Sequence, residues 1–483
     1  MPMKQLFLFL LPGLFLACNA SSDSSSASAG QSARELESPD IEVTLQGASP
    51  GSMAYLIGFF ADQRFRADSA RAEAGGNFRF RREEPYEPGL YYMVVRGVGT
   101  VQAIIDADQT FRMQSQAADV VGQMKVEGSL ENELLYQNLK FEAQFSPRYR
   151  QVAAQLKGLD PGDPQYPSLQ RKQEQLVAAR EVHLKNLFEE HPNSFFTTFK
   201  KAGQNPEPRE VRTPDGRLDT EAQVALFRRD FWKDVDFDDE RLLRTPVIHN
   251  KLKRYITELT PQRPDSIFQS AKLLIDQVLD KPEYFKFFAN WVVLHYDPQE
   301  TNLMDPEAVY VRMIQEYFTK ERAFWSDPAE IQALQMRAGE MAASLVGNQA
   351  PDVVSQNPKG QTRSIYEIDA PYIVVFMYNP ECDHCIEQTP KLVRFYDEWK
   401  DKGVEVFAIA IDTEPDKWRA FIRQNQMDWI NVFDPTNRSI YKKYFVDNTP
   451  EIYVINPDRT IIAKNLKVFQ IEEVIRRDQA KRG

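Results

Sequence analysis

The residues best suited to chemistry in this chain are two of its three cysteines, Cys382 and Cys385, in the stretch NPECDHCIEQTP at residues 379–390. A thiolate is the nucleophile of disulfide exchange, so the attacking cysteine needs a lowered pKa. Cys382 sits at the N-terminus of a predicted helix, where unpaired N–H groups and the macrodipole favour negative charge. Cys385, one turn further, is placed to attack a mixed disulfide on Cys382 and release the product. The spacing therefore predicts a redox-active pair.

The residues around the pair act in opposite directions on its reduction potential. His384 adds positive charge that would stabilise the thiolate and make the disulfide more oxidising. Asp383 and Glu381 add negative charge and oppose that effect. The residues alone therefore leave the potential open.

Four other uses of the pair are less favoured. A zinc site needs four ligands, and the sequence has neither a second CxxC nor paired histidines. A c-type haem site needs a histidine after the second cysteine, where Ile386 stands. A peroxiredoxin has Thr or Ser three residues before its reactive cysteine, where Asn379 stands. A structural disulfide across so short a loop stabilises little. We expect no metal and no organic cofactor, because the cysteines themselves carry the electrons.

The elements that must position the pair belong to an alternating pattern over residues 347–468. Residues 372–378 (YIVVFMY) and 403–412 (GVEVFAIAID) are apolar runs, typical of strands buried on both faces. Helical stretches follow them at 386–402 and 414–426. A short helix is predicted at 439–446, and strands at 450–456 and 460–465. The cysteines thus stand at the first strand-to-helix junction of an α/β unit.

This region resembles the thioredoxin family. Pro390 lies five residues after Cys385, where thioredoxin-fold helices have a proline. Thr449-Pro450 precedes a strand and is similar to the family's cis-proline. GNQAPD at residues 347–352 resembles the opening of the TlpA-like and peroxiredoxin-like branch. The resemblance implies that Pro450 exposes the backbone of Thr449 beside the cysteines, where a substrate strand docks.

Two positions depart from the family pattern. Thioredoxin has a buried aspartate six residues before its first cysteine, where this chain has Phe376. Some membrane-tethered reductases have a glutamate three residues after the second cysteine, where this chain has Gln388. The proton acceptor for Cys385 is therefore open, with Glu381, Glu387 and Tyr378 as candidates.

The N-terminus resembles that of a lipoprotein. Lys4 precedes an apolar run at residues 6–16 that is too short for a permanent membrane span, so residues 1–17 are predicted to be a signal peptide. Cys18 follows Ala17, as in the lipoprotein cleavage box, although Phe15 stands where leucine is usual. We expect Cys18 to carry lipid and Ser/Ala-rich residues 18–39 to form a flexible tether.

Two further domains are expected between the tether and the cysteines. Residues 40–128 alternate with period two, with a Gly75-Gly76 hairpin turn signal, and predict a small antiparallel β-sandwich. Residues 129–346 change to period 3.6 and predict a helical domain that begins with two long helices. The predicted fold class is therefore multidomain: the sandwich, the α-helical middle domain and a C-terminal α/β thioredoxin fold at 347–483.

The whole order of parts resembles multidomain TlpA-like thiol–disulfide lipoproteins of Gram-negative bacteria. That resemblance implies a lipid-anchored enzyme facing the periplasm, acting on disulfides of envelope proteins and recharged by a membrane electron donor. It favours a reductase over an oxidase. The formal net charge of −11 gives no support to a nucleic-acid partner. The alternative is a lipoprotein that binds an envelope ligand or partner through its front domains, with the thioredoxin domain as a redox sensor or a structural part.

Overall fold

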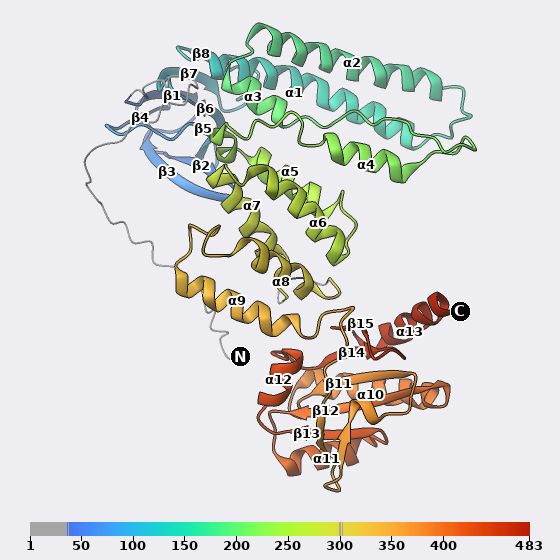
Figure 1. Cartoon of the computed structure of the whole chain (residues 1–483). Coiled ribbons are helices and arrows are strands. Elements are labelled where there is room, and N and C mark those ends of the chain that lie inside the picture. The colour runs from blue at the N-terminus through green and yellow to red at the C-terminus, as the bar shows by residue number, and fades with distance from the viewer. Residues whose placement is uncertain (1–35, 37, 299–300, 302) are drawn as a thin grey trace.

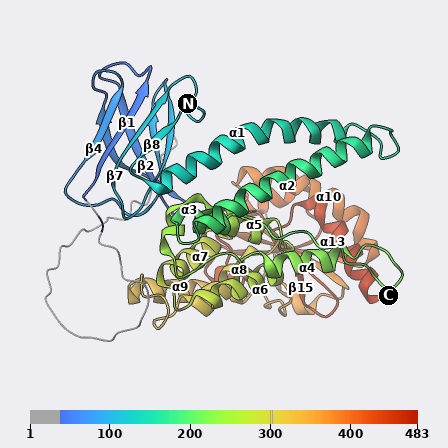
Figure 2. The same ribbon diagram turned by 90° about the horizontal axis from the view of Figure 1, so that it is seen from above.

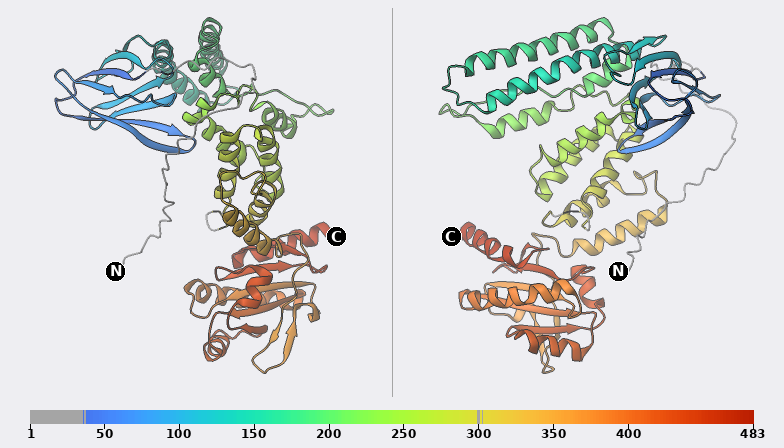
Figure 3. Two further views of the ribbon diagram at one scale, coloured as in Figure 1. Left: turned by 60° about the vertical axis from the view of Figure 1, so that its left-hand side comes forward. Right: turned by 180° about the vertical axis from the view of Figure 1, so that it is seen from behind.

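The computed structural model describes residues 36, 38–298, 301 and 303–483. The expected signal peptide, Cys18 and nearly all of the tether lie outside these residues. The described chain forms a β-sandwich, a stack of helices and a C-terminal α/β region (Figure 1). The sandwich and the C-terminal region lie at opposite ends of the helical stack, as the two views in Figure 3 show.

The sandwich has the period-two burial that its sequence predicts. Its strands are β1 (Asp40–Gln46), β2 (Met53–Phe60), β3 (Gln63–Arg71), β4 (Asn77–Arg81), β5 (Gly89–Val95), β6 (Gly99–Ile105), β7 (Thr110–Gln116) and β8 (Lys125–Glu127). Within the described residues they form two four-stranded sheets, β4-β1-β7-β8 and β3-β2-β5-β6. In β1, Ile41, Val43 and Leu45 are buried and alternate with less buried polar residues.

Two expectations for the sandwich are wrong. It is not wholly antiparallel, because β1 pairs with β7 in parallel, with Asp40 opposite Thr110. The chain uses β5 and β6 in the other sheet before it returns to β1, and such a crossover permits parallel pairing. The Gly75-Gly76 turn also joins no hairpin: β3 pairs with β2, and β4 pairs with β1. Gly76 has a φ of +79°, and a Cβ there would lie 2.3 Å from the Leu45 carbonyl oxygen.

The helical region begins on the sandwich itself. Its helices are α1 (Leu130–Lys157), α2 (Tyr166–Glu190), α3 (Phe195–Ala202), α4 (Thr220–Asp230), α5 (Pro246–Thr257), α6 (Pro264–Ile275), α7 (Pro282–His295), α8 (Pro306–Tyr317) and α9 (Pro328–Ala342), with 3₁₀-helices η1 (Glu240–Arg244) and η2 (Asp276–Val278). The two predicted long helices are α1 and α2, which run side by side as a hairpin (Figure 2). No helix in the described parts of the chain combines the length and apolar character needed to cross a membrane.

Helix α1 covers the edge of strand β6 that no other strand pairs with in the described residues. The Asn132 amide accepts from the Ile104 N–H at 2.8 Å and donates to the Ile104 carbonyl at 2.7 Å. The Tyr136 hydroxyl makes the same two kinds of bond with Gln102, at 3.2 and 3.0 Å. Two side chains therefore take the place of a neighbouring strand and satisfy the edge. One continuous apolar core then runs from the sandwich through the helices.

The C-terminal region is an α/β layer with a core on each face of its main sheet. Its strands are β9 (Val354–Gln356), β10 (Thr362–Ser364), β11 (Tyr372–Tyr378), β12 (Val404–Ile411), β13 (Ile430–Asp434), β14 (Glu451–Ile455) and β15 (Ile461–Ala463), and its helices are α10 (Asp383–Trp399), α11 (Pro415–Asn425), α12 (Arg438–Tyr444) and α13 (Val468–Arg482), with 3₁₀-helices η3 (Ile365–Glu367) and η4 (Lys400–Lys402). The main sheet has the order β13-β12-β11-β14-β15. Strand β11 lies at its centre and is buried along its whole length. Alternate residues of β11 enter the two cores, with Phe376 on one side and Met377 on the other.

Charged side chains are buried where this region meets the helices. Lys464, which follows β15, lies 3.3 Å from Glu307 in the first turn of α8, and both side chains are nearly inaccessible to solvent. Asn465 donates to the same Glu307 carboxylate at 3.1 Å. Next to it, the Asp305 carboxylate accepts from the Val346 N–H at 2.7 Å. We call these residues, together with Glu451, the junction cluster.

Candidate redox-active site

The loop between β11 and α10 places the first cysteine at a helix start. The Asn379 amide donates to the Asp412 carbonyl at 2.9 Å and accepts from the Glu381 N–H at 2.8 Å. The Cys382 N–H then donates to the Asn379 carbonyl at 3.1 Å. Cys382 is therefore the N-cap residue of α10, which confirms its predicted place at a helix N-terminus.

The two cysteines differ in exposure. Both are free thiols in the structure; Cys382 is partly exposed, whereas Cys385, one turn into α10, is fully buried. The Cys382 thiol donates to the Thr449 carbonyl at 3.1 Å. The Thr449-Pro450 peptide bond is cis, as the family resemblance implied. The sequence-predicted residues Cys382, Cys385, Thr449 and Pro450 are thus brought together.

The local donors favour the thiolate form of Cys382. Burial alone would raise the pKa of the Cys382 thiol. The Cys385 thiol and N–H, the Thr449 hydroxyl and the His384 N–H outweigh it, because each stabilises negative charge on sulfur. The pKa of Cys382 therefore lies below its ordinary value. Burial raises the pKa of the Cys385 thiol to about 12, so this cysteine holds its proton.

The residues expected to modulate the pair face the solvent. Glu381 is exposed and forms an ion pair with Lys417 at 2.7 Å. Asp383 and His384 lie exposed in the first turn of α10. The contribution of His384 to Cys382 comes from its backbone N–H rather than from its imidazole.

The three proton-acceptor candidates for Cys385 are separated by the structure. Glu387 is exposed and forms an ion pair with Lys391 at 2.6 Å, and Glu381 forms an ion pair with Lys417. Tyr378 instead is fully buried and shares the apolar core of Cys385. Phe376, at the position of the missing aspartate, stacks on the Tyr378 ring with centroids 5.0 Å apart.

Two residues at the site, Asn379 and Trp418, were not predicted from the sequence to position the thiols. Asn379 orders the turn before Cys382, and the Asn-Pro dipeptide that it begins is a recognised turn signal. Trp418, on α11, is buried and lies beside the Tyr378 hydroxyl. No local signal reports that contact, because α11 is brought to β11 only by the fold.

Comparison with known proteins assigns the C-terminal region to a family. The AhpC/TSA family model matches residues 346–464. The C-terminal region is a thioredoxin-like domain of this family. Thiol-disulfide oxidoreductase ResA of Bacillus subtilis (strain 168) is 22% identical over 116 residues, which are 24% of this chain and 64% of that protein. A ResA of Bacillus cereus is 21% identical over 147 residues, which are 30% of this chain and 77% of that protein. The thioredoxin-like domain is thus homologous to enzymes named thiol–disulfide oxidoreductases.

Solved structures with a likeness to the chain carry related descriptions. A domain of a possible thiol-disulfide isomerase from Cytophaga hutchinsonii ATCC 33406 is 30% identical and covers 29% of this chain and 97% of that one, with a TM-score of 0.28. A thioredoxin-like protein from Bacteroides caccae ATCC 43185 is 19% identical and covers 56% of this chain and 98% of that one, with a TM-score of 0.46.

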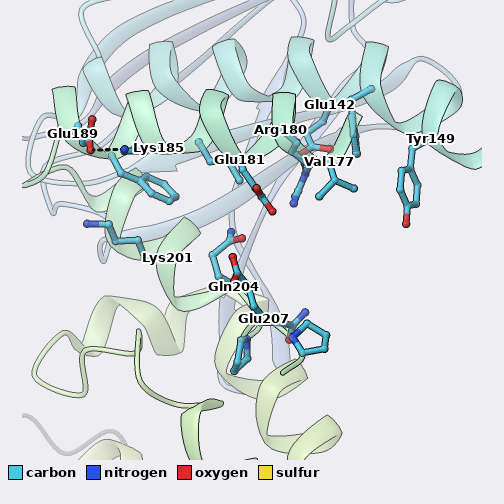
Figure 4. Close-up of a pocket in the computed structure, with 16 residues that line it drawn as sticks. Glu142, Tyr149, Val177, Arg180, Glu181, Lys185, Glu189, Lys201, Gln204 and Glu207 are labelled. Carbon is cyan, nitrogen blue, oxygen red and sulfur yellow. Dashed lines mark hydrogen bonds and ion pairs between the residues drawn. The ribbon is translucent and has the colours of Figure 1, made fainter. Parts of the chain in front are cut away.

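A hollow of about 790 Å³ lies away from the thioredoxin-like domain, in the helical region (Figure 4). Helix α1 contributes Glu142 and Tyr149, helix α2 contributes Arg180, and the segment after α3 contributes Gln204 and Glu207. Arg180 donates to the Glu142 carboxylate at 2.6 Å. The lining therefore combines aromatic and aliphatic surface with charges of both signs.

Proposed function

We propose that the chain is a membrane-anchored thiol–disulfide oxidoreductase that reduces disulfides of envelope proteins. The observation that carries this proposal is the unequal pair at the start of α10. Cys382 is partly exposed with a lowered pKa, and Cys385 is buried beneath it with a raised one. An accessible thiolate and a protected thiol are what successive attack and resolution require.

The reaction follows from this order. The Cys382 thiolate attacks one sulfur of a substrate disulfide, and the other substrate sulfur leaves as a thiolate that takes up a proton. A mixed disulfide then joins Cys382 to the substrate. The Cys385 sulfur, after losing its proton, attacks the Cys382 sulfur, and the second substrate sulfur leaves. The substrate gains two electrons, and the pair becomes a disulfide.

Substrate docking belongs to Thr449 and Pro450 in this proposal. The Thr449 carbonyl already accepts a hydrogen bond from the Cys382 thiol, so backbone at this point lies next to the reacting sulfur. An extended substrate segment beside Thr449 pairs through its own backbone, which tolerates many sequences. The expected lipid on Cys18 holds the protein at the envelope membrane, on the periplasmic side. A membrane electron donor returns the pair to its dithiol form.

The test is the reduction potential of the Cys382–Cys385 pair, measured by equilibration in glutathione or dithiothreitol buffers. For a reductase we expect a value near about −270 mV or below, at the thioredoxin end of the scale. A value near about −120 mV would instead assign an oxidant or isomerase. If the reduced protein exchanges with no test disulfide at all, the proposed activity is wrong.

A second function is favoured by the hollow between α1, α2 and the segment after α3. In this alternative the front regions bind an envelope ligand or partner, and the thioredoxin-like domain senses redox state or serves structure. A strain whose only copy carries Cys382→Ser and Cys385→Ser separates the two. Full cellular function in that strain favours the binding role with a structural thioredoxin-like domain. Loss of function shows that the cysteines are needed, and disulfide exchange by the purified protein then separates the oxidoreductase from a redox sensor.

A further inference from the structure

Resolution of the mixed disulfide requires a buried thiol to become a thiolate. Cys385 is fully buried in an apolar core; the Asn379 N–H and the Thr449 hydroxyl support charge on its sulfur, but burial outweighs them and raises the pKa of its thiol. The charged groups closest in sequence are unsuited to help it. Glu381 and Glu387 are exposed and paired with Lys417 and Lys391.

Two polar groups inside that core, the Tyr378 hydroxyl and the Trp418 indole N–H, are left without a partner among the described residues. The Tyr378 hydroxyl is buried and makes no hydrogen bond to the residues that the structure describes. Tyr378 and Cys385 pack in the same buried core, and negative charge on Cys385 raises the pKa of the Tyr378 phenol. A buried hydroxyl without a partner is uncommon, and such groups occur at redox and catalytic sites.

The Tyr378 ring has little freedom to turn away. It stacks on Phe376 at 5.0 Å and lies against Phe421 at 5.4 Å between centroids. The indole N–H of Trp418 lies beside its hydroxyl without meeting hydrogen-bond geometry and acts to lower the pKa of the phenol, against the larger effect of burial. The hydroxyl hydrogen is therefore the movable part of this side chain.

We propose that Tyr378 donates a hydrogen bond to the Cys385 thiolate as Cys385 attacks the mixed disulfide on Cys382. This role rests on the proposed oxidoreductase function. Phenol is a donor that stays protonated in a dry core, so it stabilises the thiolate without taking the proton.

The step balances without a further reactant. The proton of Cys385 passes to the departing substrate thiolate, directly or through solvent. The Cys382–Cys385 bond forms as the bond between Cys382 and the substrate breaks. Tyr378 keeps its own proton throughout, and its hydrogen bond ends when Cys385 becomes part of the neutral disulfide.

The test follows both thiols in one experiment. Reduced full chain carrying Cys18→Ser is mixed in detergent with one equivalent of 5,5′-dithiobis(2-nitrobenzoate). Attack by Cys382 releases a first coloured nitrothiobenzoate, and resolution by Cys385 releases the second, so two phases are seen in a stopped-flow trace. In Tyr378→Phe the second phase is expected to slow at least about tenfold, the loss of one hydrogen bond to a charged group. The first phase stays within about twofold.

The pH profile separates this role from a packing effect. Without the hydroxyl, the midpoint of the second phase should move to higher pH, because the Cys385 thiolate loses a stabilising donor. Trp418→Phe, which removes the neighbouring indole donor and part of a buried ring, should slow the second phase less than Tyr378→Phe does. Tyr372→Phe is the matched control: it removes a hydroxyl from the same face of β11, where it binds Asp478. It should leave both phases unchanged.

Each outcome decides one point. A second phase in Tyr378→Phe within about twofold of the parent, an unmoved pH midpoint, or an equal loss in Tyr372→Phe overturns the role of Tyr378. A parent protein that shows no nitrothiobenzoate release in either phase overturns the proposed function itself. The two failures are therefore distinguishable.

Discussion

Strand β14 separates two groups of ionisable side chains whose pKa values respond differently to burial. On one face, Ile452 packs in the core that contains Cys385. On the other, Glu451 accepts a hydrogen bond from Tyr453 and faces Glu307 and Lys464 of the junction cluster. At the thiols, backbone N–H groups at a helix start support negative charge. At the junction cluster, three carboxyl groups share one lysine.

The consequence is seen in the pKa values on the two faces. Burial raises the pKa of Asp305 to about 6 and that of Glu451 to about 8, so Glu451 holds its proton near neutral pH. Burial also acts on Cys382, but its donors outweigh it and the pKa is lowered. Asp305, like Cys382, caps a helix, so the balance between burial and nearby hydrogen-bond donors, and not helix position alone, decides which acid ionises.

The largest contrast is expected between the two thiols. Because the pKa of Cys385 is about 12 and that of Cys382 lies below its usual value, alkylation near neutral pH should be at least roughly a thousandfold faster at Cys382. Iodoacetamide labelling of the reduced protein, followed at each cysteine by peptide mass spectrometry, measures the ratio. Comparable rates at both cysteines would contradict the assignment of attacking and resolving thiols.

The next effect is on the junction cluster. Lys464→Met leaves Glu307 buried without its cation, and loss of one partner of a buried ion pair costs about 3 kcal/mol of unfolding free energy. Urea unfolding followed by tryptophan fluorescence measures it. Lys391→Met, which breaks the exposed pair with Glu387, is the matched control and should change little. Equal effects of the two changes would show that the junction pair is not buried in solution.

The third prediction concerns pH. A carboxyl group whose pKa is raised by folding binds its proton more tightly in the folded state, so its contribution to stability is lost as pH rises through the folded value. For Glu451 the unfolding free energy should fall as pH rises from about 4.5 to about 8. Glu451→Gln should flatten this fall, and Asp305→Asn should flatten only its part below about pH 6. If the pH profile of Glu451→Gln equals that of the parent, folding does not raise the pKa of Glu451.

The smallest effect is expected at His384. Its imidazole is exposed and its N–H supports Cys382, so His384→Ala should shift the reduction potential by less than about 30 mV. His384→Pro removes the N–H at a helix position that tolerates proline. It should therefore lower the potential more than alanine does, because the thiolate of the reduced form loses a donor. If His384→Ala shifts the reduction potential more than His384→Pro does, the imidazole and not the N–H is responsible.

The redox site could be predicted from sequence because it is local. An apolar run predicts β11, and the helical stretch that follows places Cys382 at a helix N-terminus; the structure begins that helix at Asp383, three residues before the predicted stretch. The partner across the site, Thr449-Pro450, was found only through the family resemblance. The buried state of Tyr378 and its approach to Trp418 depend on how α11 packs, and no pattern within either segment contains that information.

The junction cluster could not be predicted for the same reason. Asp305-Pro306-Glu307 is an ordinary helix start in sequence, where acidic residues usually face water and favour the dipole. Its partner Asn465 lies 158 residues away. The parallel pairing of β1 with β7 was equally hidden, because alternation reports which residues face a core and not which strand lies alongside.

The bonds of Asn132 and Tyr136 to strand β6 have a consequence for how such chains can be inherited. A gene fragment ending at residue 128 would encode a sandwich with an open strand edge and with the apolar surface that α1 normally covers. Recombination that transfers the sandwich without α1 would therefore produce an aggregation-prone protein. Transfer of residues 40–346 together keeps the strand edge covered. Residues 40–346 are thus expected to be transferred between genomes as one unit.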